Sequence, residues 1–154
     1  MKTVYYLMLL FICIKVNVCT TNTEQIKDTS KINYKTDSMK LQITIGDKLA
    51  SAILYDNPSA KDFASLLPLN LTLEDYNNTE KISTLSKKLT SQGAPAGFDP
   101  STGDITYYAP WGNIALFYKD FRYSTGLISL GKITEGIDAF NVTGPVSIKI
   151  ELKP

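Results

Sequence analysis

The chain has 154 residues, which is enough for one domain, and its formal net charge is +1. Its hydrophobic fraction of 44% and charged fraction of 20% are ordinary for a globular protein. Near-neutral charge excludes the clustered cations that nucleic-acid binding requires. The chain has no histidine, which excludes His-based acid–base catalysis, Ser-His-Asp triads and the commonest metal ligand.

The N-terminal segment predicts an export signal over residues 1–20. Lys2 is followed by an apolar run over residues 4–14, which is too short to span a bilayer and ends at Lys15. The alternative is an uncleaved membrane anchor, which the charge of Lys15 disfavours. Residues 21–38 are polar and lack periodicity, so they are predicted to form a disordered tether.

Cys19 leaves two outcomes open for this signal. A lipoprotein signal ends in an acylated cysteine preceded by small residues, whereas here Val16, Asn17 and Val18 precede it. Lipidation of Cys19 and ordinary cleavage are therefore both expectations. Cys13 and Cys19 both lie in this segment, so an exported domain would depend on its core rather than on disulfides. The predicted location is secreted, periplasmic or anchored at the cell envelope.

The first half of the domain alternates strand and turn signals. Period-two alternation of apolar residues over 41–45 and an apolar run over 49–55 predict two strands around a Gly-Asp hairpin. Asn57 and Pro58 are a cap and first residue of a helix whose apolar face holds Phe63, Leu66 and Leu67. The helix is expected to end at Pro68, and alternation over 69–73 predicts a third strand.

The second half adds further short strands. Residues 75–78 are predicted to form a turn, 90–103 a long loop, and 134–140 a short helical turn with Glu135 near its start. Strands are predicted over residues 80–85, 105–109, 114–118, 127–130 and 146–150. Seven or eight strands with two short helices indicate a mostly β domain over residues 39–154, closed as a barrel because closure removes exposed edges.

Residues 103–118 hold the most distinctive composition, because aromatic side chains gather there around one Pro-Trp-Gly turn. The alternatives for these rings are packing in the barrel or the wall of a ligand pocket. The predicted ligand-binding residues are Tyr107, Tyr108, Trp111, Phe117, Phe98 and Arg122. Trp111 is the first candidate because it lies at the turn, and Arg122 is expected to form a surface salt bridge unless it stacks on rings or clamps a carboxylate.

The remaining polar residues predict no catalytic or metal site and no cofactor. Asp99 and Asp104 flank a tight turn and are expected to bind local backbone, as aspartates in turns usually do. Glu80 is expected to be solvated. Glu74 and Asp75 are adjacent, so on a strand they point to opposite faces and cannot act as a pair.

Several motifs resemble one known family. Residues 131–140, Gly-Lys-Ile-Thr-Glu-Gly-Ile-Asp-Ala-Phe, resemble a cyclophilin segment, and residues 103–118 resemble the central hairpin of the cyclophilin barrel. Residues 39–153 as a whole are similar to the bacterial cyclophilin-like family of uncharacterised proteins. The resemblance implies a closed eight-stranded β-barrel with helices capping its ends.

The resemblance does not extend to the isomerase residues of cyclophilins. The chain has no His and no Phe-Met-x-Gln-Gly-Gly run, and Arg122, its one arginine, lies in a different context. Phe117 matches the place of the cyclophilin hairpin Phe, whereas Trp111 lies in a different segment from the cyclophilin Trp.

Three functions follow as expectations. The first is an exported, non-catalytic module that binds a small molecule or a peptide. The second is a weak peptidyl-prolyl cis-trans isomerase, by analogy of fold alone. The third is a structural accessory domain at the envelope surface. None involves nucleic acid, and membrane contact would arise only through a lipid anchor or an uncleaved signal.

Overall fold

A computed structural model describes residues 38–153 of the chain. The predicted export signal over residues 1–20, with Cys19, and the tether through residue 37 lie outside the described residues. The first strand begins at Met39.

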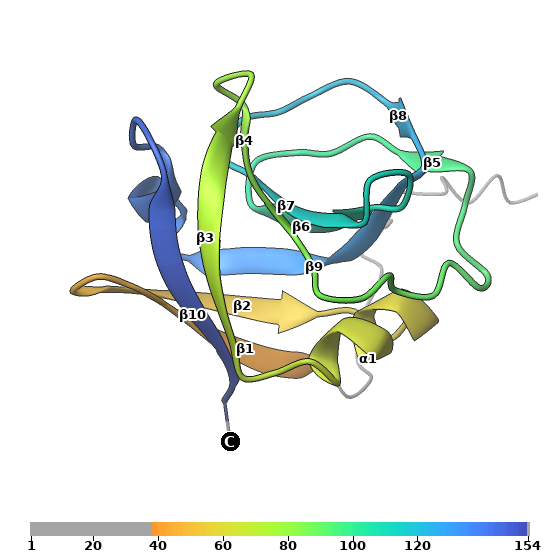
Figure 1. Cartoon of the computed structure of the whole chain (residues 1–154), viewed down its shortest axis with the longest axis horizontal. Helices are drawn as coiled ribbons and strands as arrows, with labels where there is room; N and C mark the ends of the chain where they lie inside the picture. The colour runs from red at the N-terminus through yellow and green to blue at the C-terminus, as the bar shows by residue number, and fades with distance from the viewer. Residues whose placement is uncertain (1–37, 154) are drawn as a thin grey trace, which may run out of the picture. The chain divides into compact units, whose positions relative to one another are not determined.

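Eight strands form a closed barrel in the order β1-β10-β3-β4-β7-β6-β9-β2, and each neighbouring pair is antiparallel (Figure 1). The barrel strands are β1 (Met39–Ile45), β2 (Lys48–Leu54), β3 (Leu69–Tyr76), β4 (Glu80–Thr84), β6 (Asp104–Tyr108), β7 (Asn113–Phe117), β9 (Leu127–Glu135) and β10 (Val146–Leu152). The prediction of a mostly β, closed eight-stranded barrel is confirmed.

Alternation explains why the barrel closes with a filled interior. In β1, Leu41, Ile43 and Ile45 are buried while the residues between them are only partly buried. Ile43 lies opposite Ala50 of β2 and Ile150 of β10, so one apolar residue contacts both neighbouring strands. The interior is therefore packed with side chains and is not a cavity of the barrel.

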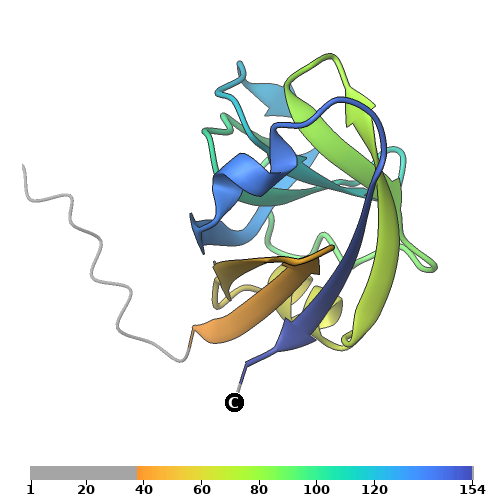
Figure 2. The same cartoon turned by 90° about the vertical axis from the view of Figure 1, so that its left-hand side faces the viewer.

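Two short helices lie near opposite ends of β2 (Figures 1 and 2). The helix α1 (Pro58–Ala64) follows β2 and buries Phe63, and the 3-10 helix η1 (Ile137–Phe140) buries Phe140. Asn57 caps α1 as predicted: its Oδ1 accepts a hydrogen bond from the Ala60 amide at 2.8 Å. The Asn57 Nδ2 also donates to the Ser129 carbonyl at 3.0 Å, which ties the helix to β9.

Two predicted helix boundaries were wrong. The helix α1 ends at Ala64, before Pro68, because Leu66 and Leu67 enter a tighter turn. Glu135 belongs to β9 and not to a helical turn, since β9 keeps pairing with β2 as far as Glu135 and Gly136 then turns the chain with a φ of 80°.

The predicted turn over residues 75–78 is shorter than expected. Asp75 and Tyr76 extend β3 and pair with Lys81 and Glu80 of β4. Asn77, Asn78 and Thr79 make the turn, and the first two have φ values of 54° and 52° that asparagine tolerates better than most residues.

The long loop over residues 90–103 contains a strand that alternation did not predict. Its β5 (Gly97–Phe98) pairs with β8 (Ser124–Thr125) to form a separate two-stranded sheet. This pairing brings two segments that are distant in the sequence to one side of the barrel (Figure 1).

Candidate functional site

The outer surface of β4, β7, β6 and β9 is apolar, although it faces away from the barrel interior. In β7, Ile114 and Leu116 belong to the main core, whereas Ala115 and Phe117 form a second buried cluster with Leu127 of β9. Successive side chains of a strand point to opposite faces. The second cluster therefore lies on the outside of the barrel and has to be covered by another segment.

The cover comes from β5, β8 and the chain before β8. Phe121 stacks on Phe117 with ring centroids 6.3 Å apart, and the Phe121 amide donates to the Pro100 carbonyl at 3.0 Å. At Gly97 the two strands approach so closely that a Cβ atom would lie 2.5 Å from the Ser124 carbonyl oxygen. Only glycine fits this approach without displacing the backbone of β8.

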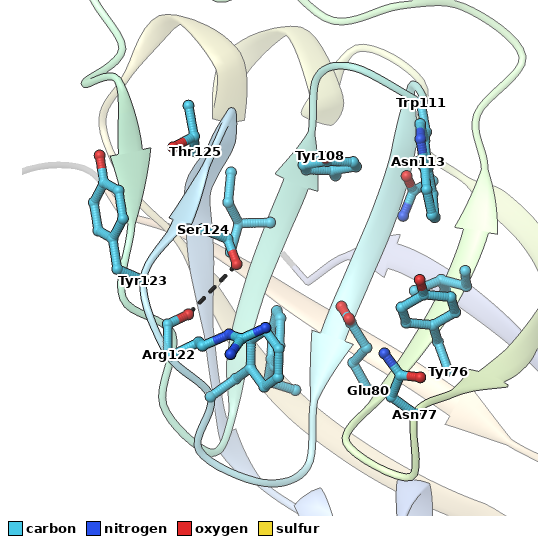
Figure 3. A pocket seen from close by; sticks show the side chains of 14 residues that line it. Tyr76, Asn77, Glu80, Tyr108, Trp111, Asn113, Arg122, Tyr123, Ser124 and Thr125 are labelled. Atoms are coloured by element: carbon cyan, nitrogen blue, oxygen red, sulfur yellow. Dashed lines mark hydrogen bonds between the residues drawn. The ribbon is translucent and has the colours of Figure 1, made fainter.

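Between this cover and the β6–β7 turn lies a cavity of about 450 Å³, here called the outer pocket (Figure 3). Tyr76, Tyr108 and Trp111 border one side of it, and Arg122 and Tyr123 border the other. Glu80, Asn113 and Phe117 also line it. The floor of the pocket is formed by barrel strands whose opposite face packs in the main core, so the floor is preorganised.

Trp111 lies on the turn between β6 and β7. The Gly112 amide donates to the Tyr108 carbonyl at 2.9 Å, and Gly112 has a φ of 76°. The Trp111 ring makes edge contacts with Tyr108 at 5.3 Å and with Tyr76 at 5.8 Å between centroids. It remains 57% exposed, so most of its surface is available to a ligand.

The structure brings four of the six predicted ligand-binding residues together. Tyr108, Trp111, Phe117 and Arg122 line the outer pocket. Tyr107 points into the main core, where it is 1% exposed and its hydroxyl oxygen accepts a hydrogen bond from the Leu89 amide at 3.1 Å. Phe98 packs against the second buried cluster beneath the pocket and is not part of its lining.

Glu80 is the lining residue that the sequence analysis misjudged. It is partly buried rather than solvated, and burial raises the pKa of its carboxyl from 4.5 to about 7. Among residues 38–153 no hydrogen bond or ion pair reaches this carboxylate. The one feature of the sequence that pointed to this burial is the spacing of Glu80 from Ile82. Residues two apart on a strand share a face, and Ile82 packs against the second buried cluster.

Asn113 adds a second polar group without a full set of partners. Asn113 is 4% exposed, and its Nδ2 donates to the Ile114 carbonyl at 3.3 Å. That bond fixes the amide orientation and leaves Oδ1 without a hydrogen-bond partner among the described residues. A buried polar atom of this kind is uncommon in folded proteins.

Arg122 does not form the predicted surface salt bridge with any residue of the described part of the chain. Its guanidinium lies over the Phe121 ring, 5.6 Å from the centroid, which is the stacking alternative. The planar group remains exposed at the pocket border.

The other carboxylates have structural roles or lie outside the pocket. Asp104 accepts from the Ser101 amide at 2.7 Å, as expected for an aspartate in a turn, and also from Lys132 at 3.0 Å. Within residues 38–153, no group of three or more His, Cys, Asp or Glu side chains is placed to hold a metal ion. The polar lining of the outer pocket consists of one carboxylate, two amides, one guanidinium and the hydroxyls of Ser124, Thr125 and the tyrosines.

The fold and this pocket define a small antiparallel barrel domain with a preorganised site on its outer face. A family model described as "Cyclophilin-like family" matches residues 43–151, and the chain belongs to this family. The solution structure of the hypothetical protein AF2241 from Archaeoglobus fulgidus is similar in fold, with a TM-score of 0.54 and 20% sequence identity. That similarity covers 75% of this chain and 95% of the archaeal one.

No curated protein matches the chain. In the part of the chain that the structure describes, no helix combines the length and the apolar character needed to cross a membrane.

Proposed function

We propose that this cyclophilin-like domain is a non-catalytic module that binds a small molecule or a peptide in the outer pocket. The observation that supports this most directly is the cavity itself, with a volume of about 450 Å³ and a lining of rings over a rigid sheet. Ligand sites of this size are usually apolar with a few placed polar groups. Glu80, Asn113 and Arg122 are among those groups here.

The polar lining favours binding over catalysis. A nucleophilic hydroxyl needs a base within hydrogen-bond reach. The Ser124 hydroxyl instead donates to the Arg122 carbonyl at 3.4 Å. Since the chain has no histidine, a general base in the pocket would have to be Glu80, and no lining hydroxyl of residues 38–153 donates to it.

The module is proposed to act after export, with residues 1–20 as the signal. Intact-mass measurement of the protein from its own cells tests this directly. Cleavage would remove the first residues, and lipidation of Cys19 would add the mass of its acyl chains. A full-length mass would contradict processing and favour the uncleaved anchor.

A ligand screen tests the binding function. Small metabolites and short peptides are titrated into labelled protein, and the resonances of Tyr108, Trp111 and Asn113 are followed by NMR. Hits are expected to shift these resonances and to lose affinity in Trp111→Ala. Leu49→Ala is the matched control, because Leu49 is also an exposed apolar residue, 61% accessible, and lies outside the pocket.

Two results would contradict the proposal. One is a screen whose hits all map away from the outer pocket. The other is a rate above buffer in a protease-coupled proline isomerisation assay, which would favour the isomerase instead.

A further inference from the structure

The outer pocket has two chemically different ends. Glu80 and Arg122 are its charged lining residues within the described chain, and they do not pair with each other. Figure 3 shows Arg122 beside Tyr123 on one side, whereas Trp111, Asn113 and Tyr76 lie on the other, with the Glu80 carboxylate pointing into the space between them. Arg122 is held over Phe121. The end away from Arg122 is here called the ring end, and Glu80 belongs to it because Glu80 lies opposite Tyr76 in the pairing of β3 with β4.

The rings of this end are arranged as walls rather than as a stack. The planes of Tyr76 and Tyr108 are inclined to that of Trp111 by 86° and 84°. All three rings line the same cavity. The face of an aromatic ring carries partial negative charge, and several ring faces around one space attract an organic cation.

The ring end holds two acceptors that have no hydrogen-bond donor among residues 38–153. The Glu80 carboxylate has no partner among residues 38–153, and neither has the Asn113 Oδ1, whose amide nitrogen is already bonded to Ile114. The Asn113 oxygen is itself buried, and Asn113 lines the pocket. Acceptors that lack donors are satisfied by a ligand that carries N–H groups.

We propose that the ring end of the outer pocket, formed by Tyr76, Tyr108, Trp111, Glu80 and Asn113, binds an organic cation with N–H donors, such as a lysine or arginine side chain of a peptide. This proposal rests on the binding function proposed above and names the chemistry of its ligand. A primary ammonium or guanidinium group satisfies both features at once, because its charge is attracted by the rings and its N–H groups reach the two acceptors. A neutral donor reaches the acceptors without the attraction between the rings and a positive charge, and an anion without donors gains neither.

Burial of Glu80 supports this arrangement and makes it sensitive to pH. Desolvation raises the pKa of Glu80 to about 7, so the carboxyl is substantially protonated in neutral solution when no cation is present. A bound cation favours the ionised form, so binding releases a proton and weakens as the pH falls below 7. The other ionisable groups that line the pocket are the phenols of Tyr76, Tyr108 and Tyr123 and the guanidinium of Arg122.

The test uses Trp111 as a reporter, since it is the single tryptophan of the chain. Its fluorescence is followed during titration with the N-acetyl, N-methylamide derivatives of lysine, arginine, norleucine and glutamate. Near pH 8 the two cationic probes are expected to bind at least about tenfold more tightly than the neutral norleucine probe. The acidic probe is expected to bind weakest.

Variants assign this preference to Glu80. Glu80→Gln is expected to bring the affinity of the lysine probe to within about twofold of the norleucine probe, while the norleucine affinity is unchanged. Glu135→Gln makes the same charge change at an exposed residue outside the pocket and is expected to keep the preference. Thermal melts confirm that both variants fold.

The outcomes separate this inference from the proposed function. Equal binding of the neutral and cationic probes, or an unchanged preference in Glu80→Gln, would overturn the cation site while leaving a pocket that binds ligands. Absence of binding by the cationic probes would also overturn it, and the function would then depend on the broader screen. If neither the cationic probes nor the compounds of the ligand screen bind in the outer pocket, the proposed binding function is contradicted as well.

Discussion

The Nζ atom of Lys81 lies 2.7 Å from Oδ2 of Asp75, and the Lys81 side chain is completely buried. The same ammonium donates to the carbonyls of Val142 and Gly144 at 2.6 and 2.9 Å. Lys81 therefore joins β3 and β4 to the segment before β10. Tyr118 donates its hydroxyl to the same Asp75 oxygen at 2.9 Å, which completes a partly buried polar network.

Replacing Lys81 with methionine is expected to destabilise the protein by about 3–5 kcal/mol, because it removes the cation paired with Asp75 and the donor of two carbonyls. The free energy of unfolding from denaturant titration measures this. Lys149→Met is the control, since Lys149 pairs with Glu151 on the surface and its loss is expected to cost about 0–1 kcal/mol. Equal costs for the two variants would show that the network contributes no more than a surface pair.

The same network predicts a pH dependence of stability. The hydrogen bond from Lys81 holds the pKa of Asp75 below its ordinary value of 3.8, with a smaller contribution from Tyr118. The ionised form is favoured in the folded state, so this stability is present above the unfolded pKa and is lost as the pH falls through the folded one. Asp75→Asn is expected to be much less stable than the natural chain near pH 6, and the difference is expected to shrink in acid. A constant difference across this range would contradict the assignment.

Glu80 is expected to behave in the opposite way. Burial raises its pKa from 4.5 to about 7, so the folded state binds a proton that the unfolded state has released, and stability falls as the pH rises across that interval. Glu80→Gln is therefore expected to stabilise the unliganded protein near pH 8 by about 1 kcal/mol, after allowing for solvent screening. Near pH 4 the gain is expected to disappear. A loss of stability near pH 8 would mean that the carboxylate has a favourable partner when ionised.

Neighbouring tyrosine and tryptophan residues are expected to differ sharply in their contribution to folding. Trp111→Ala removes an exposed ring with two edge contacts and is expected to cost about 1 kcal/mol or less in stability while abolishing the fluorescence signal. Tyr107→Ala empties a core position and is expected to cost about 3–5 kcal/mol. Chemical denaturation followed by circular dichroism compares them, and similar costs would place both rings in the core.

The narrow approach at Gly97 predicts that the pocket wall depends on one glycine. A Cβ atom there would lie 2.5 Å from the Ser124 carbonyl oxygen and 2.6 Å from the Tyr123 hydroxyl oxygen. Gly97→Ala is expected to displace β8 and to cost about 1–3 kcal/mol, the range seen for overpacked sites. The amide resonances of Ser124 and Thr125 report the displacement; unchanged resonances would show that the wall tolerates the methyl group.

Local signals predicted most of the barrel. The alternation of Leu41, Ile43 and Ile45 and the cap at Asn57 depend on neighbours a few residues away, and both were confirmed. The pairing of Phe98 with Ser124 depends on contacts between distant segments, and no local sequence pattern predicts it. The cover over the outer face of β6 and β7 therefore could not be predicted from the sequence.

The candidate site was harder to predict for the same reason. Tyr107 and Tyr108 are adjacent, so alternation places them on opposite faces, but both faces of β6 are buried and the pattern does not say which side is the interior. Glu80 owes its raised pKa to desolvation among residues that include Phe121 and Arg122, about forty positions later in the sequence. Charge and spacing alone therefore made it look like an ordinary surface carboxylate.

The five residues of β7 are all buried, since Ile114 and Leu116 face the barrel interior while Ala115 and Phe117 face the covered outer cluster. A strand enclosed on both faces exposes its amides only when both layers separate. The amide hydrogens of β7 will consequently exchange with solvent only in openings that disrupt the whole domain, whereas those of β8 will exchange through local opening of the cover. The pocket thus combines a floor as long-lived as the fold itself with a wall that opens independently of it.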